Sequence, residues 1–244
     1  MSLTVSKDNT NQLPQISQSN SRVRRGRVVG CVVVPAALVA FLCFIGVFGG
    51  NVREVDPGRL YRSSQLTGNG YEALTARAAG NSLKAVIVAH HIKTVLNLRG
   101  GSLRDARIRD EVETCKVSGV DYIDDAFSAR SLPPPNTVLK MLEAFDHAKY
   151  PILVHCQAGA DRTGLACTVY ANIYMNEPID IAESRELTWR FGHFRFSNTR
   201  PMDEFFDLYR STSGGMSLRE WILRKYPAVY ARLHPIVLTQ STTK

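Results

Sequence analysis

VHCQAGADRTG, at residues 154–164, is the stretch that decides the fold. It overlaps the continuous apolar run YPILVHC (150–156), which is typical of a strand covered on both faces of a sheet. The segment after it, TGLACTVYANIYMN (163–176), is expected to be a helix. A turn between a buried strand and a helix lies at the carboxyl end of the strand, where open α/β sheets bind ligands.

The chain from residue 51 onward continues this alternation of short strands and helices. Two more strands are expected at KTVLNL (93–98) and VDYID (120–124). Helical patterns cover residues 102–119, 134–148, 179–191, 201–210 and 217–233. Strands that alternate with helices predict an α/β fold with a central, mostly parallel sheet flanked by helices. We assign residues 51–236 to this one domain and residues 237–244 to a loose tail.

The amino-terminal part has a different composition. Residues 1–27 are polar, end in the basic run SRVRRGR and hold too few apolar residues to fold, so we expect them to be disordered. Residues 28–50 form a run of 23 uncharged, mostly apolar residues. At roughly 1.5 Å per residue this run is long enough to cross a hydrocarbon core of about 30 Å. It predicts one transmembrane helix. The alternatives are a buried core helix and a cleaved signal peptide, which includes a signal of the twin-arginine type.

Charge predicts the orientation of this span. Four arginines precede it, whereas Arg53 and Glu54 follow it. The positive-inside rule then keeps the amino end in the cytoplasm. The domain from residue 51 onward is expected across the membrane, in a periplasmic or other extracytoplasmic space.

The overall composition excludes several classes of protein. The formal net charge is +8, but Lys7 and four arginines against Asp8 place +4 of it in the first 50 residues. The remainder is only mildly basic and shows no stripe of Lys and Arg interleaved with aromatic residues, so nucleic acid is not an expected partner. The five cysteines include no CxxC pair, which argues against a disulfide scaffold or a structural zinc site.

The quoted loop combines a thiol, a fixed positive charge and a flexible backbone. Gly159 allows the chain to curl so that successive N–H groups point into one hollow, which the amino end of the following helix completes. Arg162 can hold two oxygens of a phosphate with its planar guanidinium. Cys156 at the floor of this cradle is expected to ionise readily and to attack phosphorus. The expected phosphate-binding residues are Gln157, Ala158, Gly159, Ala160, Asp161 and Arg162.

The alternative interpretation is a buried cysteine that only packs, since Cys-x5-Arg also arises by chance. The pattern here is more specific, because His155, Thr163 and Gly164 also occupy fitting positions. HCQAGADRTG resembles the signature loop of the cysteine-based protein tyrosine and dual-specificity phosphatases, His-Cys-x5-Arg-Thr/Ser-Gly. GRLYRSSQL (58–66), TVLNLRGG (94–101) and ARSLPPP (129–135) are similar to segments of bacterial-type members, so the resemblance covers most of residues 55–200.

This resemblance implies a mechanism in two steps. Cys156 attacks phosphorus to form a cysteinyl-phosphate, which water then hydrolyses. Arg162 binds the phosphate and stabilises the transition state, while Thr163 donates a hydrogen bond to the departing sulfur. His155 orients the loop. The family needs neither a metal ion nor a cofactor.

The general acid is an aspartate in this family, and three candidates stay open. Asp124 and Asp125 stand 32 and 31 positions before Cys156, at the end of a predicted strand, as in dual-specificity members. Either of them can equally be a residue that only caps a loop. Asp161 precedes the arginine, where myotubularin-like and some bacterial lipid-active phosphatases carry an aspartate assigned to proton transfer. Its alternative role is to hold the loop, and we give Asp125 a slight preference.

Other polar residues are interpreted as structural. Arg62 and Arg130 are expected at the surface in ordinary ion pairs. RFGHFRF (190–196), with His193, is expected to be core rather than a wall of the site.

The substrate is inferred from the loop. Phosphoinositide-directed relatives often have lysines where this chain has Gln157 and Ala160, so a phosphorylated protein, with phosphotyrosine first and phosphoserine or phosphothreonine next, is favoured. A phosphoinositide or another small phosphate ester is the second choice. The rival classes are an inactive module that binds phosphorylated partners and a different cysteine enzyme, such as a sulfurtransferase or an arsenate reductase.

Overall fold

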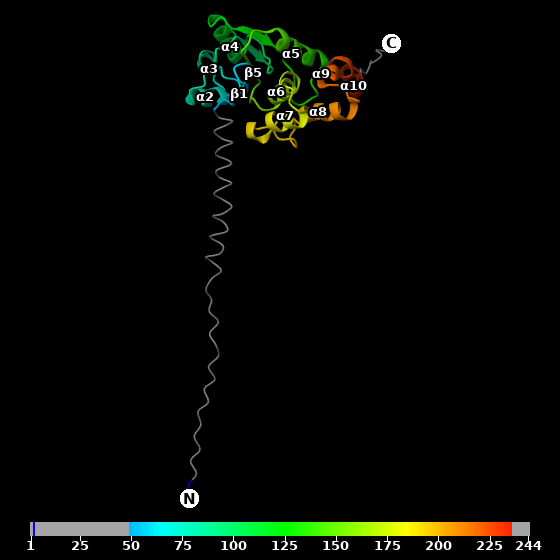
Figure 1. Cartoon of the computed structure of the whole chain (residues 1–244). Helices are drawn as coiled ribbons and strands as arrows, with labels where there is room; N and C mark the ends of the chain where they lie inside the picture. Colours follow the sequence, from blue (N-terminus) through cyan, green and yellow to red (C-terminus); the bar gives the residue numbers. More distant parts are fainter. Residues whose placement is uncertain (1, 3–48, 236–244) are drawn as a thin grey trace, which may run out of the picture. The chain divides into compact units, whose positions relative to one another are not determined.

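Five short strands form one sheet in the computed structural model, which describes residues 2 and 49–235 (Figure 1). Their order across the sheet is β1-β2-β5-β3-β4. β1 runs antiparallel to β2, and all other neighbours are parallel. The strands are β1 (Arg53–Asp56), β2 (Leu60–Ser63), β3 (Thr94–Asn97), β4 (Asp121–Asp124) and β5 (Ile152–His155). The mostly parallel sheet is confirmed, whereas the β1–β2 hairpin was not predicted from the pattern.

Helices follow most strands and supply the remaining structure. They are α2 (Tyr71–Ala78), α3 (Leu83–His90), α4 (Ala106–Val117), α5 (Pro135–His147), α6 (Asp161–Tyr174), α7 (Ile179–Glu186), the short 3-10 helix η1 (Trp189–Phe191), α8 (Pro201–Thr212), α9 (Leu218–Arg224) and α10 (Tyr226–Leu233). The predicted helix at 217–233 is two helices, because Pro227 lacks an N–H and its ring clashes with the preceding turn. The predicted helix at 179–191 likewise ends at Glu186, and Thr188 is extended before η1 begins.

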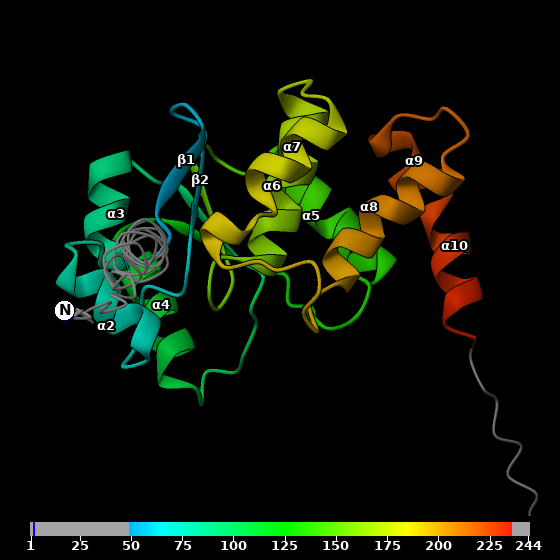
Figure 2. The same ribbon diagram turned by 90° about the horizontal axis from the view of Figure 1, so that it is seen from below.

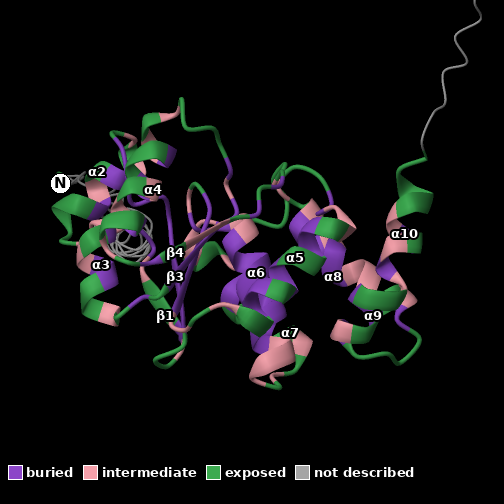
Figure 3. Ribbon diagram, turned by 90° about the horizontal axis from the view of Figure 1, so that it is seen from above, coloured by how far each residue is buried: buried purple, intermediate pink, exposed green. Residues whose placement is uncertain are grey.

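The sheet lies between two layers of helices (Figure 2). Successive strand residues point to opposite faces, as the pleat requires. On β5, Leu153 packs in a core with residues of α2, α3 and α4, whereas Ile152 and Val154 pack in a larger core with α5, α6, α8, α9 and α10. Figure 3 shows the consequence, since the central strands and most of α6 are buried. A continuous apolar run is therefore what this strand needs.

The register brings three strand ends together. Asn97 at the end of β3 pairs with His155 on one side and with Asp124 on the other. The residues that follow β5 and β4 therefore emerge at the same edge of the sheet, two strand spacings or roughly 10 Å apart. This edge carries the loop that begins at Cys156.

The predicted transmembrane segment falls almost entirely on residues outside the description, as does the disordered segment predicted at 1–27, apart from residue 2. Of the predicted span, only Gly49 and Gly50 are described, in a turn. Within residues 49–235, none of the helices has both the length and the apolar character that a bilayer crossing requires.

Candidate active site

The loop between β5 and α6 curls because donors from outside hold its carbonyl groups. Three carbonyl oxygens of the loop each accept one hydrogen bond from a residue outside it: Gln157 from the Gln65 N–H at 2.9 Å, Ala158 from Asn51 Nδ2 at 2.8 Å and Gly159 from Arg62 Nη2 at 2.8 Å. In a planar trans peptide the N–H points opposite to the C=O. The N–H groups of residues 158–160 consequently face the other side, toward the hollow of the loop. We call this arrangement the cradle, because N–H groups that face one hollow can bind an anion.

Gly159 has a backbone conformation that the curl depends on. Its φ is +70°, in the left-handed region. A Cβ at this position would lie 2.6 Å from the Ser63 carbonyl oxygen and 2.7 Å from the Ser64 nitrogen. Both atoms belong to the backbone after β2 and cannot give way cheaply. Glycine is therefore required here for conformation and for space.

Arg62 lies beneath this loop, not at the surface, so that prediction was wrong. Its side chain is fully buried, and Nη1 donates to both the Glu186 carbonyl and a Glu186 carboxylate oxygen at 2.7 Å. The guanidinium also stacks on Phe191, 3.7 Å from the ring centroid. β2 is buried along its whole length, which places Arg62 inside. Arg130, in contrast, is exposed as expected.

Cys156 sits at the floor of the loop with 2% of its surface exposed. Burial by itself would raise the pKa of its thiol, but the charge of Arg162 and the Thr163 hydroxyl and N–H outweigh burial, and the pKa is lowered. The Thr163 hydroxyl has no other hydrogen-bond partner among the described residues. By comparison, burial without such partners raises the pKa of Cys115 to about 12. Of the three cysteines described, Cys156 alone has a lowered pKa.

Arg162 is anchored from one side of its guanidinium. Nη1 donates to three carbonyl oxygens, those of Leu98, Arg99 and Phe127, at 3.0 to 3.4 Å. Its Nε is buried and has no partner within residues 49–235. One edge of the planar group is thus fixed by the loops after β3 and β4, and a donor is left for an oxyanion.

His155 ties the loop to the neighbouring helix. Nδ1 contacts the Cys156 carbonyl at 3.2 Å, and Nε2 lies 2.8 Å from Glu111 of α4. Burial lowers the pKa of this imidazole, but the buried Glu111 carboxylate outweighs that effect and the pKa is raised. A charged imidazole satisfies both contacts as a donor.

Asp125 and Asp124 differ in burial at the end of β4. Asp125 is 4% exposed, and burial raises the pKa of its carboxyl to about 6, offset in part by Lys140. Its Oδ2 is buried without a partner among the described residues. Asp124 is exposed, and desolvation also raises the pKa of its carboxyl. Phe127, two residues after Asp125, contacts Arg162, so this loop adjoins the cradle.

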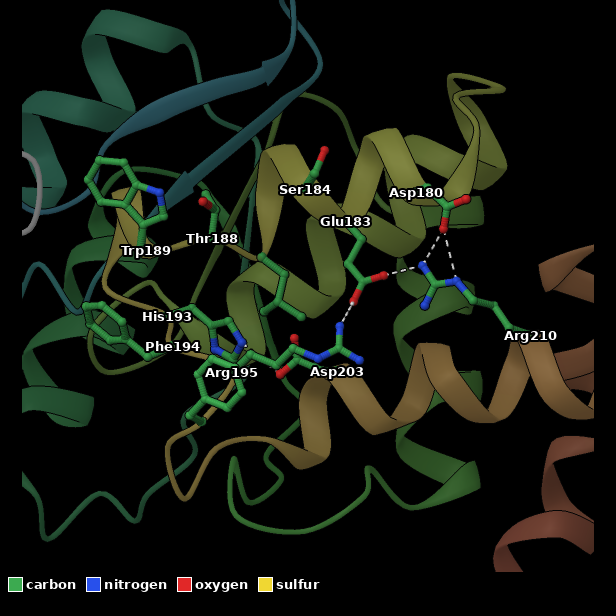
Figure 4. A pocket seen from close by; sticks show the side chains of 12 residues that line it. Asp180, Glu183, Ser184, Thr188, Trp189, His193, Phe194, Arg195, Asp203 and Arg210 are labelled. Atoms are coloured by element: carbon green, nitrogen blue, oxygen red, sulfur yellow. Dashed lines mark hydrogen bonds and ion pairs between the residues drawn. The ribbon is translucent and has the colours of Figure 1, made fainter.

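Asp161, the third candidate, is contacted by His193. Oδ1 lies 2.7 Å from His193 Nδ1, and His193 Nε2 lies 2.9 Å from Asp203 of α8. His193 also lines a surface pocket of about 540 Å³ over α7 and α8, together with Trp189 and Phe194 (Figure 4). Phe194 and Phe196 are exposed, so RFGHFRF is not core as predicted, although His193 itself is 2% exposed.

Several residues of this arrangement gave no signal in the sequence. Asn51, Glu111 and Asp203 stand far from the loop in the chain and belong to no motif. Arg62 and Gln65 lie within GRLYRSSQL, and that resemblance was the available signal. Within residues 49–235, no group of three or more His, Cys, Asp or Glu side chains is arranged to hold a metal ion.

The comparison with known protein families agrees with this geometry. The model of the tyrosine phosphatase family matches residues 46–191, more than half of the chain. The chain belongs to the tyrosine phosphatase family. As a member it is a phosphatase, a hydrolase of phosphate esters. The match begins before β1 and ends at Phe191, so it includes the whole sheet, α6 and α7 of this phosphatase.

Solved structures of other phosphatases are also similar to this one. The core catalytic domain of the PP-IP phosphatase SIW14 from S. cerevisiae, in complex with citrate, is 18% identical, covers 67% of this chain and 93% of that chain, and has a TM-score of 0.47. P. aeruginosa TpbA is 21% identical, with 63% and 86% covered and a TM-score of 0.44. A complex of TpbA with pTyr is 19% identical, with 67% and 96% covered and a TM-score of 0.44. No curated protein matches the chain.

Proposed function

We propose that this phosphatase hydrolyses phosphorylated proteins, phosphotyrosine first and phosphoserine or phosphothreonine as well, through a cysteinyl-phosphate on Cys156. The observation that carries the proposal is the cradle itself. A thiol of lowered pKa lies under N–H groups that face inward, beside an arginine with an unpaired Nε. A phosphate dianion fits such a site in shape and charge.

In the first step the Cys156 sulfur attacks phosphorus, the S–P bond forms and the bond from phosphorus to the ester oxygen breaks. The leaving oxygen takes a proton from Asp125. In the second step water attacks phosphorus, the S–P bond breaks and Asp125 takes a proton from the water. The Thr163 hydroxyl, free of other partners among the described residues, donates to the departing sulfur. Arg162 holds the equatorial oxygens in both steps.

We assign the acid to Asp125 among the three candidates. A general acid works best with a pKa near the working pH, and burial raises the pKa of Asp125 to about 6. Asp124 is exposed and Lys140 donates to its carbonyl group. Asp161 is already engaged by His193, whose Nδ1 lies 2.7 Å from its Oδ1.

The absence of lysine from the loop supports a protein substrate over a phosphoinositide. Gln157 and Ala160 are uncharged, and Asp161 adds a negative charge near the cradle. A head group with several phosphates gains from added cations, whereas a single phosphotyrosine needs only one anion site.

The test is a substrate panel on the domain from residue 49 onward, with Cys156→Ser as the control. We expect phosphotyrosine peptides to be hydrolysed with the highest kcat/KM, and the serine variant to be inactive on all substrates. If phosphoinositides are hydrolysed faster than phosphopeptides, the proposed substrate class is wrong but the proposed mechanism through Cys156 is retained. Binding of phosphopeptides without turnover by the unmodified chain would show a binding module instead of an enzyme.

We also propose that residues 28–50 anchor the phosphatase in a membrane, with the amino end in the cytoplasm and the catalytic domain on the other side. The support is the sequence: 23 uncharged residues behind four arginines. Protease protection of the full chain in membrane vesicles tests it. In inside-out vesicles the catalytic domain should be protected and the amino end digested, and the reverse pattern would refute the orientation.

A further inference from the structure

His193 joins the first residue of α6, next to Arg162, to the first turn of α8. It stands between η1 and α8, and its ring is 2% exposed. Both ring nitrogens contact carboxylates: Nδ1 the Asp161 carboxylate at 2.7 Å and Nε2 the Asp203 carboxylate at 2.9 Å. The two carboxylates come from the first turns of α6 and α8.

The geometry requires a proton on each ring nitrogen. A neutral imidazole has one N–H and one lone pair, so one of the two carboxylates would face a lone pair. A doubly protonated ring donates to both and neutralises one of the two negative charges. Burial by itself lowers the pKa of His193, but Asp161 and Asp203 outweigh it and raise the pKa to about 9.

The position of Asp161 makes this contact relevant to catalysis. Asp161 is the first residue of α6 and immediately precedes Arg162. A carboxylate there is directed either toward the phosphate, where it repels the dianion, or away from it. The 2.7 Å contact holds Oδ1 toward the buried ring of His193, which in turn contacts Asp203 of α8. The same bond fixes the start of the helix that carries Arg162.

We propose that His193 is a positioning residue of the phosphate loop: its imidazolium, held by Asp203, fixes the Asp161 carboxylate away from the substrate and offsets its charge. The proposal rests on the proposed function, since it concerns the binding of phosphate in the same loop. It concerns affinity for the anion more than the chemical step, because no atom of His193 touches the reacting groups.

Other charges near His193 are already paired. On α7, Glu183 binds Arg210 and lies 3.8 Å from Arg195 (Figure 4). Arg210 also binds Asp180, and Arg195 binds Asp207. The carboxylates that face the His193 ring directly are therefore those of Asp161 and Asp203, and the pH dependence follows from these three groups.

Asparagine and glutamine separate the two contacts of His193. The amide nitrogen of asparagine occupies about the place of Nδ1, and that of glutamine the place of Nε2. His193→Asn can therefore keep the bond to Asp161, whereas His193→Gln can keep only the bond to Asp203. Both variants are uncharged and remove a similar part of the ring, so a loss of packing affects them alike. His147→Gln, at an exposed position on α5, is the control.

The experiment measures the dissociation constant of tungstate, an unreactive dianion, by calorimetry, and kcat and KM for para-nitrophenyl phosphate. We expect His193→Gln to weaken tungstate and raise KM about tenfold, with kcat changed less than threefold. His193→Asn should fall between the two, with a loss of about threefold, because it keeps the bond to Asp161 but lacks the positive charge of the ring. Equal losses in both variants, or no loss in either, would overturn the proposal.

The pH dependence gives a second measurement that does not depend on variants of His193. Tungstate binding by the unmodified enzyme should weaken above about pH 9, when the ring loses a proton. In Asp203→Asn the weakening should begin at lower pH, because one of the charges that raises this pKa is gone. An unchanged profile would refute the role of His193. If the unmodified enzyme binds tungstate but hydrolyses no ester, the proposed function fails and this inference is still tested by binding.

Discussion

Arg62 offers the sharpest test of how the cradle is built. Its side chain is fully buried, and the side chain of its ion-pair partner Glu186 is 5% exposed. Nη2 of Arg62 donates to the Gly159 carbonyl at 2.8 Å. Arg62→Met keeps a long apolar stem and removes the charge and all the donors. Two consequences follow, one for stability and one for catalysis.

The loss of stability comes from Glu186, a buried carboxylate that then keeps only the 2.8 Å contact with the more exposed Arg185. Removing one partner of a buried ion pair costs about 3–5 kcal/mol, and the remaining contact places this loss at the lower end, about 3 kcal/mol. At about 2–4 °C per kcal/mol for a domain of this size, the thermal midpoint should fall by roughly 6–12 °C. The double variant Arg62→Met with Glu186→Gln removes both charges and should recover most of this loss, because no buried charge is left unpaired.

The loss of catalysis comes from the Gly159 carbonyl and should not recover. A hydrogen bond from a charged donor contributes about 1.5–3 kcal/mol, which corresponds to about 10- to 100-fold in kcat/KM at 1.4 kcal/mol per factor of ten. Circular dichroism measures the midpoint, and hydrolysis of para-nitrophenyl phosphate measures kcat/KM. A double variant that regains full activity, or a single variant with an unchanged midpoint, would refute this account.

Three further predictions concern the loop and the acid. Asp125→Asn should lower the rate on esters with poor leaving groups by about 10²- to 10⁴-fold. In the unmodified enzyme, kcat/KM should fall as the pH rises through about 6, where Asp125 loses its proton. If the pH–rate profile of the variant keeps this fall, Asp125 is not the general acid. The same substitution should stabilise the fold above pH 6 in thermal unfolding, because the ionised form of a group with a raised folded-state pKa is the destabilising one. Gly159→Ala should remove tungstate binding and activity together, since its Cβ meets the backbone of Ser63 and Ser64; near-normal kcat would show that the curl of the loop is not needed. Iodoacetate should label Cys156 before Cys115 and Cys167 near neutral pH, in line with its lowered pKa; mass spectrometry that finds equal labelling would contradict an ionised sulfur at the floor of the loop.

Local pattern in the sequence was sufficient for the elements around the loop. YPILVHC and KTVLNL are short apolar runs, and each corresponds to a strand because a strand buried on both faces needs apolar residues on both. VDYID corresponds to the edge strand β4, in which no residue is buried. The helix boundaries that failed, at 186–188 and at 225–226, depend on backbone breaks that periodicity does not show. The hairpin of β1 and β2 was missed because β1 contains three charged residues and only one buried one.

The sequence by itself determined that a thiol, an arginine and a glycine share one loop between a strand and a helix, because spacing along the chain sets that directly. The tertiary structure alone decided what surrounds the loop. Asn51, Arg62 and Gln65 reach its carbonyl groups from about 100 positions away, and burial separates Asp125 from Asp124 next to it. Hydrogen bonds and desolvation depend on distances in space, and contacts between remote segments leave no periodic trace in a single sequence.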